Sequence, residues 1–455
     1  MAIESINPAT GELIKVYRPM DDVEVESALD EACLAWRAWR RTDIAERADL
    51  MRRAAVILRE RCEEYAQLMT AEMGKPIVQA RAEIEKCAVV CEFYAEKAAS
   101  FLAPEEVETE ASHSFVSYEP LGPVLAVMPW NFPFWQVFRF AAPALMAGNG
   151  GILKHASNVY GCALAIEAVF RDAGFPEHLF RTLVIGSDKV ASVIDDRRIT
   201  AVTLTGSTPA GQAVASRAGQ ALKKTVLELG GSDPYVVLAD ADLELSVAAC
   251  VTGRLQNTGQ SCIAAKRFIV VADIYDEFQE RLLQAMSEKQ FGDPCDESMD
   301  LGPMAKESLR DELHDQVVRS IEAGARCLLG GEIPDRPGAF YPPTLLTQVS
   351  AGMPAYHEEL FGPVATLIRA ADEAEAIMIA NDTPFGLGAA VFTADLEHGT
   401  DIARRELHAG ACFVNDFVRS DPRLPFGGIK ESGYGRELGV FGIREFVNIK
   451  AVYVR

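Results

Sequence analysis

The stretch Val124-Leu125-Ala126-Val127-Met128-Pro129-Trp130-Asn131-Phe132-Pro133 opens the part of the chain that decides the fold. Its first five residues form a short apolar run typical of a buried strand, and the prolines and polar residue that follow end that run. Similar short apolar runs recur along the chain at Gly151–Leu153, Arg181–Ile185, Ala201–Leu204 and Pro234–Leu238. Helical stretches separate them, for example Ala163–Ala173 and Ala210–Ala221. This alternation predicts a parallel α/β sheet of the doubly wound type.

Helical segments precede this series. Asp21 and Asp22 can cap a first helix, in which apolar residues recur at helical spacing from Val23 to Trp39. A second helical stretch extends from Arg47 to Glu72 and stops at Gly74, a residue type that often ends helices. We interpret these helices as packing layers.

A second series of strands and helices follows from about residue 231 to 428, so we predict two Rossmann-like α/β lobes. Ser114–Glu119 and Phe446–Val454 also have the pattern of strands, but they fit neither lobe. The predicted division, in residue numbers, is a cofactor-binding domain of 1–103 and 121–229, a catalytic domain of 230–428, and a small β extension of 104–120 and 429–455.

Composition excludes several classes of protein. The 455 residues are 49% hydrophobic and 24% charged, as in ordinary globular enzymes, and the net charge of −22 argues against nucleic-acid or anionic-membrane partners. The start of the chain lacks the basic and apolar regions of a signal peptide, so we expect a cytoplasmic protein with reduced cysteines. Cys87 and Cys91 favour one buried helix face over a metal pair, and no histidine spacing indicates a metal site.

Three segments carry groups suited to acyl chemistry. The polar stretch Asn257-Thr258-Gly259-Gln260-Ser261-Cys262 ends in a thiol, Pro129–Pro133 contains the amide of Asn131, and Leu227-Glu228-Leu229-Gly230-Gly231 contains a carboxylate. Oxidation of an aldehyde to an acid through a covalent intermediate needs a nucleophile, a stabiliser for the oxyanion and a base that activates water. We therefore predict that Cys262, Asn131 and Glu228 take these roles in that order.

Each of these residues also has a structural interpretation. An isolated cysteine is usually a buried, unreactive hydrophobe. Asn131 precedes a predicted helix and could cap it. Glu228 could be an ordinary surface or ion-paired carboxylate. The accompanying motifs favour the catalytic interpretation of Cys262, whereas for Asn131 and Glu228 that interpretation rests on the family resemblance that follows.

On these motifs, the chain resembles the NAD(P)-dependent aldehyde dehydrogenases along essentially its whole length. The resemblance implies a fold of two Rossmann-like lobes with a β extension that joins subunits, hence a homodimer or homotetramer. It also implies catalysis by Cys262, Asn131 and Glu228. Within the family, the chain is most similar to the bacterial succinate-semialdehyde dehydrogenases.

The resemblance also implies where the cofactor binds. Thr205-Gly206-Ser207-Thr208-Pro209 follows a strand and opens a helix, a place suited to a pyrophosphate, although a plain strand–turn–helix corner has the same pattern. Ser207, with Gly206, is expected there. The resemblance assigns Glu359 to the nicotinamide ribose and Phe361 to the ring, and Trp130 is a further expected cofactor-binding residue.

Lys154 and Ser157 lie where this kind of fold reads the adenosine ribose. Many relatives that prefer NAD carry a glutamate at the position of Ser157. A small hydroxyl beside a lysine removes repulsion toward a 2′-phosphate, so we expect NADP to be preferred and NAD to be accepted. The alternative is that Ser157 is an uninvolved loop residue.

The segment after Asn131 bears on the substrate. Trp135 and Arg139 follow at helical spacing, so we expect both on one helix face, with Arg139 aimed back toward Asn131. A guanidinium there suits a substrate carboxylate, although an internal ion pair is the alternative. Ser261, and Arg419 and Ser420 from a later loop, are further candidate donors.

We therefore predict oxidation of succinate semialdehyde to succinate, with a small carboxylate-bearing aldehyde as substrate, NADP or NAD as cofactor, and no metal. Three alternatives remain open. The substrate could be glutarate semialdehyde or a medium-chain aldehyde. The acyl group could pass to coenzyme A, although Glu228 favours hydrolysis. The chain could also be a catalytically silent structural relative.

Overall fold

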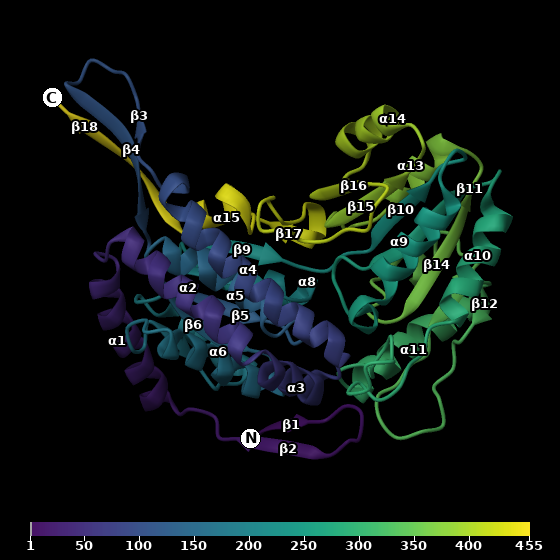
Figure 1. The fold of residues 1–455 in the computed structure, drawn as a ribbon, viewed down its shortest axis with the longest axis horizontal. Helices are drawn as coiled ribbons and strands as arrows, with labels where there is room; N and C mark the ends of the chain where they lie inside the picture. Colours follow the sequence, from purple (N-terminus) through teal and green to yellow (C-terminus); the bar gives the residue numbers. More distant parts are fainter. Residues whose placement is uncertain (1) are drawn as a thin grey trace.

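A computed structural model describes residues 2–455 and contains two lobes, each built on a mostly parallel sheet (Figure 1). The six-stranded sheet of the first lobe has the order β17-β9-β8-β5-β6-β7. Its strands are β5 (Pro123–Met128), β6 (Gly150–His155), β7 (Phe180–Thr182), β8 (Ala201–Thr205), β9 (Lys224–Glu228) and β17 (Gly433–Tyr434). All neighbours pair in parallel except β17 and β9. The chain leaves β5 on one side for β6 and returns on the other as β8, which is the doubly wound topology predicted from the sequence.

Helices cover both faces of this sheet. The alternation of side chains in β5 explains how, because Leu125 joins one apolar cluster while Val124 and Ala126 join another. The first cluster contains α1 (Asp22–Trp39), α7 (Val190–Asp195) and α8 (Thr208–Gln220). The second contains α2 (Ile44–Glu60), α3 (Cys62–Met73), α4 (Ile77–Phe101), α5 (Trp135–Met146) and α6 (Tyr160–Asp172).

The second lobe repeats this architecture with seven strands in the order β12-β13-β14-β11-β10-β15-β16. The strands are β10 (Asp233–Val237), β11 (Ala265–Val271), β12 (Arg326–Leu329), β13 (Thr344–Thr347), β14 (Val364–Ala370), β15 (Gly388–Phe392) and β16 (Ala411–Val414). Only β12 pairs antiparallel. One face packs on α9 (Leu243–Leu255) and α10 (Tyr275–Ser287), and the other on α11 (Glu307–Glu322), α12 (Pro354–His357) and α13 (Glu373–Asn381). The short α14 (Leu396–Asp401) and α15 (Gly439–Arg444) follow later in the chain.

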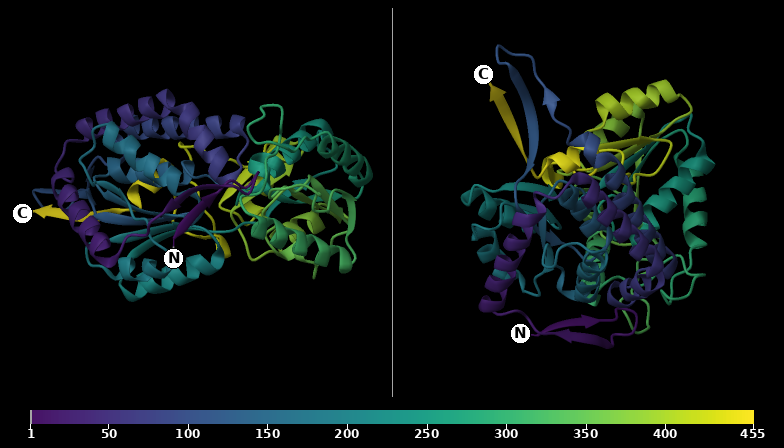
Figure 2. Two further views of the ribbon diagram at one scale, coloured as in Figure 1. Left: turned by 90° about the horizontal axis from the view of Figure 1, so that it is seen from below. Right: turned by 60° about the vertical axis from the view of Figure 1, so that its left-hand side comes forward.

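Two small sheets lie outside the lobes. An arm of β3 (Glu105–Glu106), β4 (His113–Pro120) and β18 (Val447–Val454) projects from the body and carries the C-terminus (Figures 1 and 2). A hairpin of β1 (Ile3–Ile6) and β2 (Leu13–Tyr17) lies at the opposite edge of the molecule. No helix of residues 2–455 is long and apolar enough to cross a membrane.

The structure confirms most predicted elements and corrects two. The stretch from Arg47 to Glu72 is not one helix, because Arg61 leaves the helical conformation and separates α2 from α3, which lets α3 pack on β1. The strand expected over Arg181–Ile185 ends at Thr182, and the Val184 carbonyl accepts a hydrogen bond from Met20 N outside the sheet. The predicted domain bounds stay a prediction, although β17, expected in the extension, pairs with β9 of the first lobe.

This architecture places loops of both lobes face to face. The carboxyl ends of β5, β8 and β9 supply one wall, at the point where the strand order of the first sheet reverses. Segments that precede β11 and β14 supply the other wall. Ligands of doubly wound sheets bind at such reversal points, so this junction is the expected location of a ligand site.

Candidate active site

A cavity of about 250 Å³ lies at this junction and collects residues from both lobes. Of the residues singled out in the sequence, it is lined by Trp130, Asn131, Gly206, Ser207, Cys262, Glu359 and Phe361. A larger cavity along α11 shares Leu309, Glu359 and Phe361 with it. Together the two cavities form space that extends from the Cys262 thiol along the second lobe.

Cys262 lies just before β11 and is a free, partly exposed thiol. Burial raises its pKa to about 12, whereas the positive charges of Arg139 and Lys266 act in the opposite direction. Lys266 Nζ also donates to the Cys262 carbonyl at 2.8 Å. The thiol is therefore protonated at neutral pH in this structure, and nucleophilic attack needs a base or a ligand that favours the thiolate.

The loop before Cys262 is held in an unusual backbone conformation. Asn257 and Thr258 have φ of 55° and 56°, in the left-handed region that few non-glycine residues adopt. Gln79 Oε1 accepts from the Asn257 backbone N–H at 2.6 Å, and Thr258 Oγ1 accepts from Gly302 N at 3.1 Å. Buried hydrogen bonds of this kind hold strained backbone in place at functional sites.

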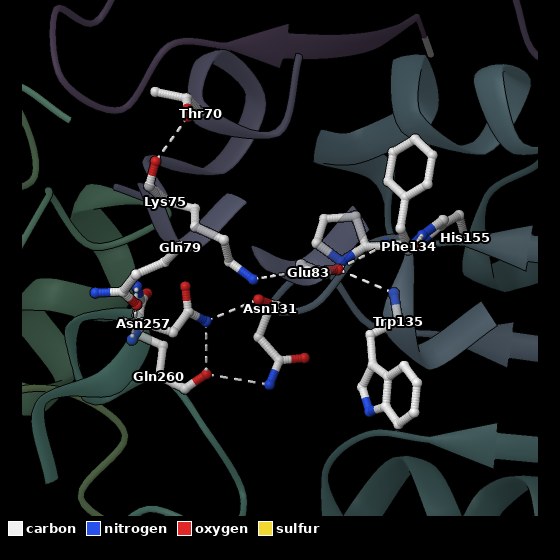
Figure 3. Close-up of polar contacts among 11 residues, drawn as sticks. Thr70, Lys75, Gln79, Glu83, Asn131, Phe134, Trp135, His155, Asn257 and Gln260 are labelled. Carbon is white, nitrogen blue, oxygen red and sulfur yellow. Dashed lines mark hydrogen bonds and ion pairs between the residues drawn. The ribbon is translucent and has the colours of Figure 1, made fainter. Parts of the chain in front are cut away.

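Asn131 is tied to the same loop (Figure 3). Its Nδ2 donates to the Gln260 carbonyl at 3.1 Å, and its own carbonyl accepts from Asn257 Nδ2 at 2.7 Å. Asn131 caps no helix, since α5 begins at Trp135 with no side-chain cap. One amide hydrogen of Asn131 is used by Gln260, so the second is free to meet an oxygen in the cavity.

A buried carboxylate fixes the segment that follows Asn131. Glu83 Oε1 accepts from the backbone N–H groups of Phe134 and Trp135, both at 2.9 Å, and Glu83 also pairs with the buried Lys75 (Figure 3). His155 Nε2 contacts the Pro133 carbonyl at 2.9 Å; burial lowers the pKa of His155 to about 4, so the ring is neutral and donates. These contacts hold the turn between β5 and α5 from both sides.

Glu228 ends β9 and is 1% exposed. Neither of its carboxylate oxygens has a hydrogen-bond partner among residues 2–455. Burial raises its pKa well above the ordinary value; Arg139 opposes this rise and Glu437 adds to it. Gly427, at φ +152°, passes so close that a Cβ there would lie 2.7 Å from Glu228 Oε1, which explains the glycine. A buried, unpaired acid of this kind suits a base that gains and loses a proton.

Arg139 occupies a different position from the one predicted. It is 2% exposed and forms an ion pair with Glu437, while its Nη2 lies 3.5 Å from Thr205 Oγ1 and its guanidinium covers the Phe426 ring. The internal ion pair, which the sequence left open as the alternative, is therefore the arrangement in the structure. Glu437 satisfies the charge that a substrate carboxylate was expected to meet, and the sequence offered no local signal for this distant partner.

The predicted phosphate site has the features that a pyrophosphate needs. Ser207 immediately precedes α8 and is exposed, and its side chain makes no capping hydrogen bond, so its hydroxyl and the first N–H groups of the helix are available. Gly211, one turn later, packs against Leu229, where a Cβ would lie 2.5 Å from Leu229 Cδ2. A dinucleotide therefore fits the residues at the start of α8.

Lys154 and Ser157 lie at and just after the end of β6, with Lys154 half-buried and Ser157 exposed. Burial, and then the charge of Lys306, lowers the pKa of Lys154. Neither lysine forms a salt bridge with an acid in the described part of the chain. Lys154 and Lys306, which have no acidic partner, suit a 2′-phosphate together with the small hydroxyl of Ser157. The sequence did not indicate Lys306.

The remaining cofactor candidates line the cavity opposite Ser207. Trp130 and Phe361 meet edge to face with ring centroids 5.8 Å apart. Glu359 accepts from Gly231 N at 3.0 Å and lies 3.2 Å from Lys266 Nζ. Gly230 passes close to this carboxylate, since a Cβ there would lie 2.5 Å from Glu359 Oε2 and would displace it.

The candidate substrate residues divide into two groups. Trp135 and Ser420 approach one another through Lys86 of α4, whose Nζ donates to Ser420 Oγ at 2.7 Å and lies 4.2 Å from the centroid of the Trp135 ring. Arg419 instead pairs with Asp416 at 2.6 Å on the surface, and Ser261 is buried. The structure thus brings Trp135 and Ser420 together and leaves Arg419 apart from them.

Sequence patterns missed the residues that position the site: Gln79, Glu83, Lys86, Asn257 and Glu437. Asn257 carried one usable signal, because asparagine is among the few non-glycine residues that adopt left-handed backbone. The residues on α4 carried none, since their partners lie on distant segments. Across residues 2–455 no group of three or more acidic, histidine or cysteine side chains could hold a metal ion.

Comparisons with known proteins agree with this geometry. The sequence profile described as "Aldehyde dehydrogenase family" matches residues 1–452. The chain is 54% identical over 454 residues to the probable succinate-semialdehyde dehydrogenase [NADP(+)] of Synechocystis sp., covering 100% of both chains. It is 51% identical to the succinate semialdehyde dehydrogenase [NAD(P)+] of Escherichia coli K12, covering 99% of this chain and 97% of that one. The crystal structure of succinic semialdehyde dehydrogenase from Streptococcus pyogenes in complex with NADP+ superposes with a TM-score of 0.97 at 38% identity, covering 100% of both chains.

Proposed function

Because the chain belongs to the aldehyde dehydrogenase family, we propose that it oxidises succinate semialdehyde to succinate, with NADP as the preferred cofactor and NAD as the alternative. One observation carries this proposal: a single cavity holds the Cys262 thiol, the Asn131 amide and the uncapped start of α8 at Ser207. The names of the similar enzymes from Synechocystis sp. and Escherichia coli support the substrate.

Cys262 is the nucleophile in this proposal. Its sulfur adds to the aldehyde carbon as the C=O π bond opens toward oxygen, and the proton that burial holds on the resting thiol passes to solvent water. The oxygen of the resulting hemithioacetal develops negative charge. The free amide hydrogen of Asn131 and the Cys262 backbone N–H are the donors proposed for it.

The residues fit a dinucleotide with its phosphates at Gly206 and Ser207 and its nicotinamide end beside Trp130, Glu359 and Phe361. Bound there, NADP would supply the acceptor for the hydride that leaves the carbon attached to sulfur. Lys154 and Ser157 are proposed to hold the 2′-phosphate, with Lys306 as a second cation. The absence of a carboxylate at position 157 supports the preference for NADP.

Glu228 is the base of the second half-reaction. After hydride transfer the acyl group remains on Cys262 as a thioester, and a water molecule must lose a proton to attack it. Burial favours the proton on Glu228, so the side chain must first lose that proton, which the charge of Arg139 favours, before it can take one from water. Hydrolysis then releases succinate and returns the thiol.

The proposal includes assembly and location. The exposed side chains of Ile449, Tyr453 and Val454 on the β18 arm support a homodimer or homotetramer in which the arms are covered. We also propose that the enzyme is cytoplasmic and that its domains divide as predicted from the sequence. We propose no macromolecular partner besides other copies of the chain.

The decisive test is a set of initial rates with purified protein. We expect the highest kcat/KM for succinate semialdehyde with NADP, a lower value with NAD, and lower values for glutarate semialdehyde and butyraldehyde. Adding coenzyme A should change none of these rates. A higher kcat/KM for an uncharged medium-chain aldehyde, or dependence on coenzyme A, would contradict the proposal.

A further inference from the structure

Lys266 is a cation buried in β11, 1% exposed, and no sequence motif indicates a role for it. Its Nζ donates to the Ser261 carbonyl at 3.0 Å and to the Cys262 carbonyl at 2.8 Å, and it pairs with Glu359 Oε1 at 3.2 Å. Burial lowers the pKa of Lys266, and the charge of Glu359 opposes this change. Lys266 therefore joins the backbone of the nucleophile to an acid that lines the same cavity.

The Ser261 carbonyl belongs to the peptide group that carries the Cys262 N–H. In a trans peptide the C=O and N–H bonds point in opposite directions, and residues 2–455 contain no cis peptide bond. An ammonium held on the Ser261 carbonyl therefore fixes the direction of the Cys262 N–H on the other side of the group. That N–H donates to no backbone carbonyl within the described chain, so it is free to meet the oxygen of a hemithioacetal.

The charge of Lys266 also strengthens this donor. A hydrogen bond to a peptide oxygen polarises the whole amide group and makes its N–H a better donor, and a charged donor does so more than a neutral one. Asn131, the other donor proposed for the oxyanion, has no comparable support, because its Oδ1 has no hydrogen-bond partner in residues 2–455. The two oxyanion donors therefore differ, and only the backbone donor is backed by a cation.

A second buried cation, Arg254 of α9, contacts the same loop without this effect. Its Nη2 donates to the Gly259 carbonyl at 2.6 Å. The N–H of that peptide group belongs to Gln260 and already donates to the Asn257 carbonyl at 3.0 Å. Of these two cations, Lys266 is thus the one that acts on a free N–H beside the thiol.

We propose that Lys266 is a positioning residue that aims and polarises the Cys262 N–H, and so favours those attacks by the thiol that create an oxyanion. This inference rests on the proposed function and deepens it. Addition of the sulfur to an aldehyde carbon moves the C=O π electrons to oxygen, and the N–H meets the resulting charge. Displacement of iodide from iodoacetamide also forms an S–C bond, but the electron pair leaves with iodine and no oxyanion forms.

The test compares these two reactions in Lys266→Met and Lys266→Gln, with Lys97→Met, an exposed ion-paired lysine of α4, as the control. Rapid mixing with succinate semialdehyde at saturating NADP records the rate of the first turnover. Mass spectrometry of the Cys262 peptide records alkylation by iodoacetamide at the same pH, with and without NADP. Alkylation is the reference because Lys266 also lowers the pKa of Cys262 and so changes the amount of thiolate in both reactions.

We expect the first turnover of Lys266→Met to slow by about 10- to 50-fold more than its alkylation does, which is less than the loss of a whole oxyanion donor. Lys266→Gln keeps a neutral donor and should show a smaller excess. Lys97→Met should match the wild type in both reactions. Circular dichroism checks folding, and if Lys266→Met does not fold, the excess must appear in Lys266→Gln.

The outcomes separate this inference from the proposed function. Equal losses in the two reactions would mean that Lys266 serves the thiolate or the fold alone, which overturns the inference. A folded Lys266→Met with a normal first turnover would overturn it as well. Both results leave the proposed function standing, whereas a wild type that does not oxidise succinate semialdehyde would overturn that function.

Discussion

Asn131 lines the cavity of the Cys262 thiol and Glu228 lies near enough to raise the pKa of that thiol, but the surroundings of the two side chains are opposite. The amide of Asn131 is held through Gln260 and Asn257, and Gln79 of α4 in turn holds the Asn257 backbone. The carboxylate of Glu228 is equally buried and has no hydrogen-bond partner in the described chain. The difference matches the chemistry. An oxyanion donor must keep its position through every step, whereas a base must gain and lose a proton and contact a water molecule.

The two surroundings also differ in free energy. On the Asn131 side the amide nitrogens of Asn131 and Asn257 exchange hydrogen bonds with water for hydrogen bonds within the protein, which stabilises the fold slightly, although both Oδ1 atoms have no partner in residues 2–455. The Glu228 side leaves a polar group buried without compensation, which destabilises it. Stability given up at a site of this kind is common where function requires it. Substitutions on each side should therefore have separable effects on rate and on stability.

The largest effect is expected at the unpartnered carboxylate. Glu228→Gln should lower the steady-state rate by about 10²- to 10⁴-fold, because the amide cannot take a proton from water. The first turnover should still occur, so rapid mixing should record a burst of reduced cofactor near one per active site. Complete loss of the burst would mean that Glu228 also takes the proton of Cys262. An unchanged steady state would remove Glu228 from the mechanism.

A smaller effect is expected on the fixed side. Asn131→Ala should reduce kcat/KM by about 10²- to 10³-fold, the usual consequence of losing one oxyanion donor. The burst of reduced cofactor should become slow in Asn131→Ala, because this substitution affects hemithioacetal formation. In Glu228→Gln the burst should keep its rate. Gln220→Ala, at the exposed end of α8, is the control. A normal burst in Asn131→Ala would mean that Asn131 serves the loop and not the reaction.

The comparison also explains which parts of the molecule the sequence could predict. Cys262, Asn131 and Glu228 lie in short contiguous motifs next to strands, and those strands alternate with helices, so both fold class and nucleophile were accessible. The sequence could not predict the residues that hold Asn131 in place or the acid that pairs with Arg139. Those contacts join segments that are distant in the chain. Arg139 shows the physical limit: the sequence indicates that a buried guanidinium needs an anion, but not whether that anion is a substrate or Glu437. The break at Arg61 has no glycine or proline to mark it.

Removing a support of Asn131, and not Asn131 itself, should have an intermediate effect. Gln79→Ala leaves the Asn257 N–H without its acceptor and loosens a left-handed loop, so we expect kcat to fall by about 5- to 20-fold with KM nearly unchanged. Gln79→Glu keeps an acceptor and should recover most of the rate. Gln67→Ala, on the exposed surface of α3, is the control. If Gln79→Glu is as slow as Gln79→Ala, the Asn257 contact is not what matters.

The smallest effect concerns stability on the Glu228 side, and its sign follows from proton linkage. The pKa of Glu228 is raised in the folded state, so the folded protein holds this proton more tightly than the unfolded chain does. As pH rises above the ordinary range of a glutamate, the unfolded chain loses the proton first, and the contribution of Glu228 to folding stability falls. The amide introduced by Glu228→Gln cannot ionise, so the Tm of this variant should exceed that of the wild type by about 1–3 °C at neutral pH, with the gap closing toward pH 4. Scans at one heating rate from pH 4 to pH 8 would measure this, with Glu280→Gln on the exposed surface of α10 as the control. A gap that does not change with pH would mean that folding leaves the pKa of Glu228 where it is in the unfolded chain, and that water meets its unpartnered oxygens.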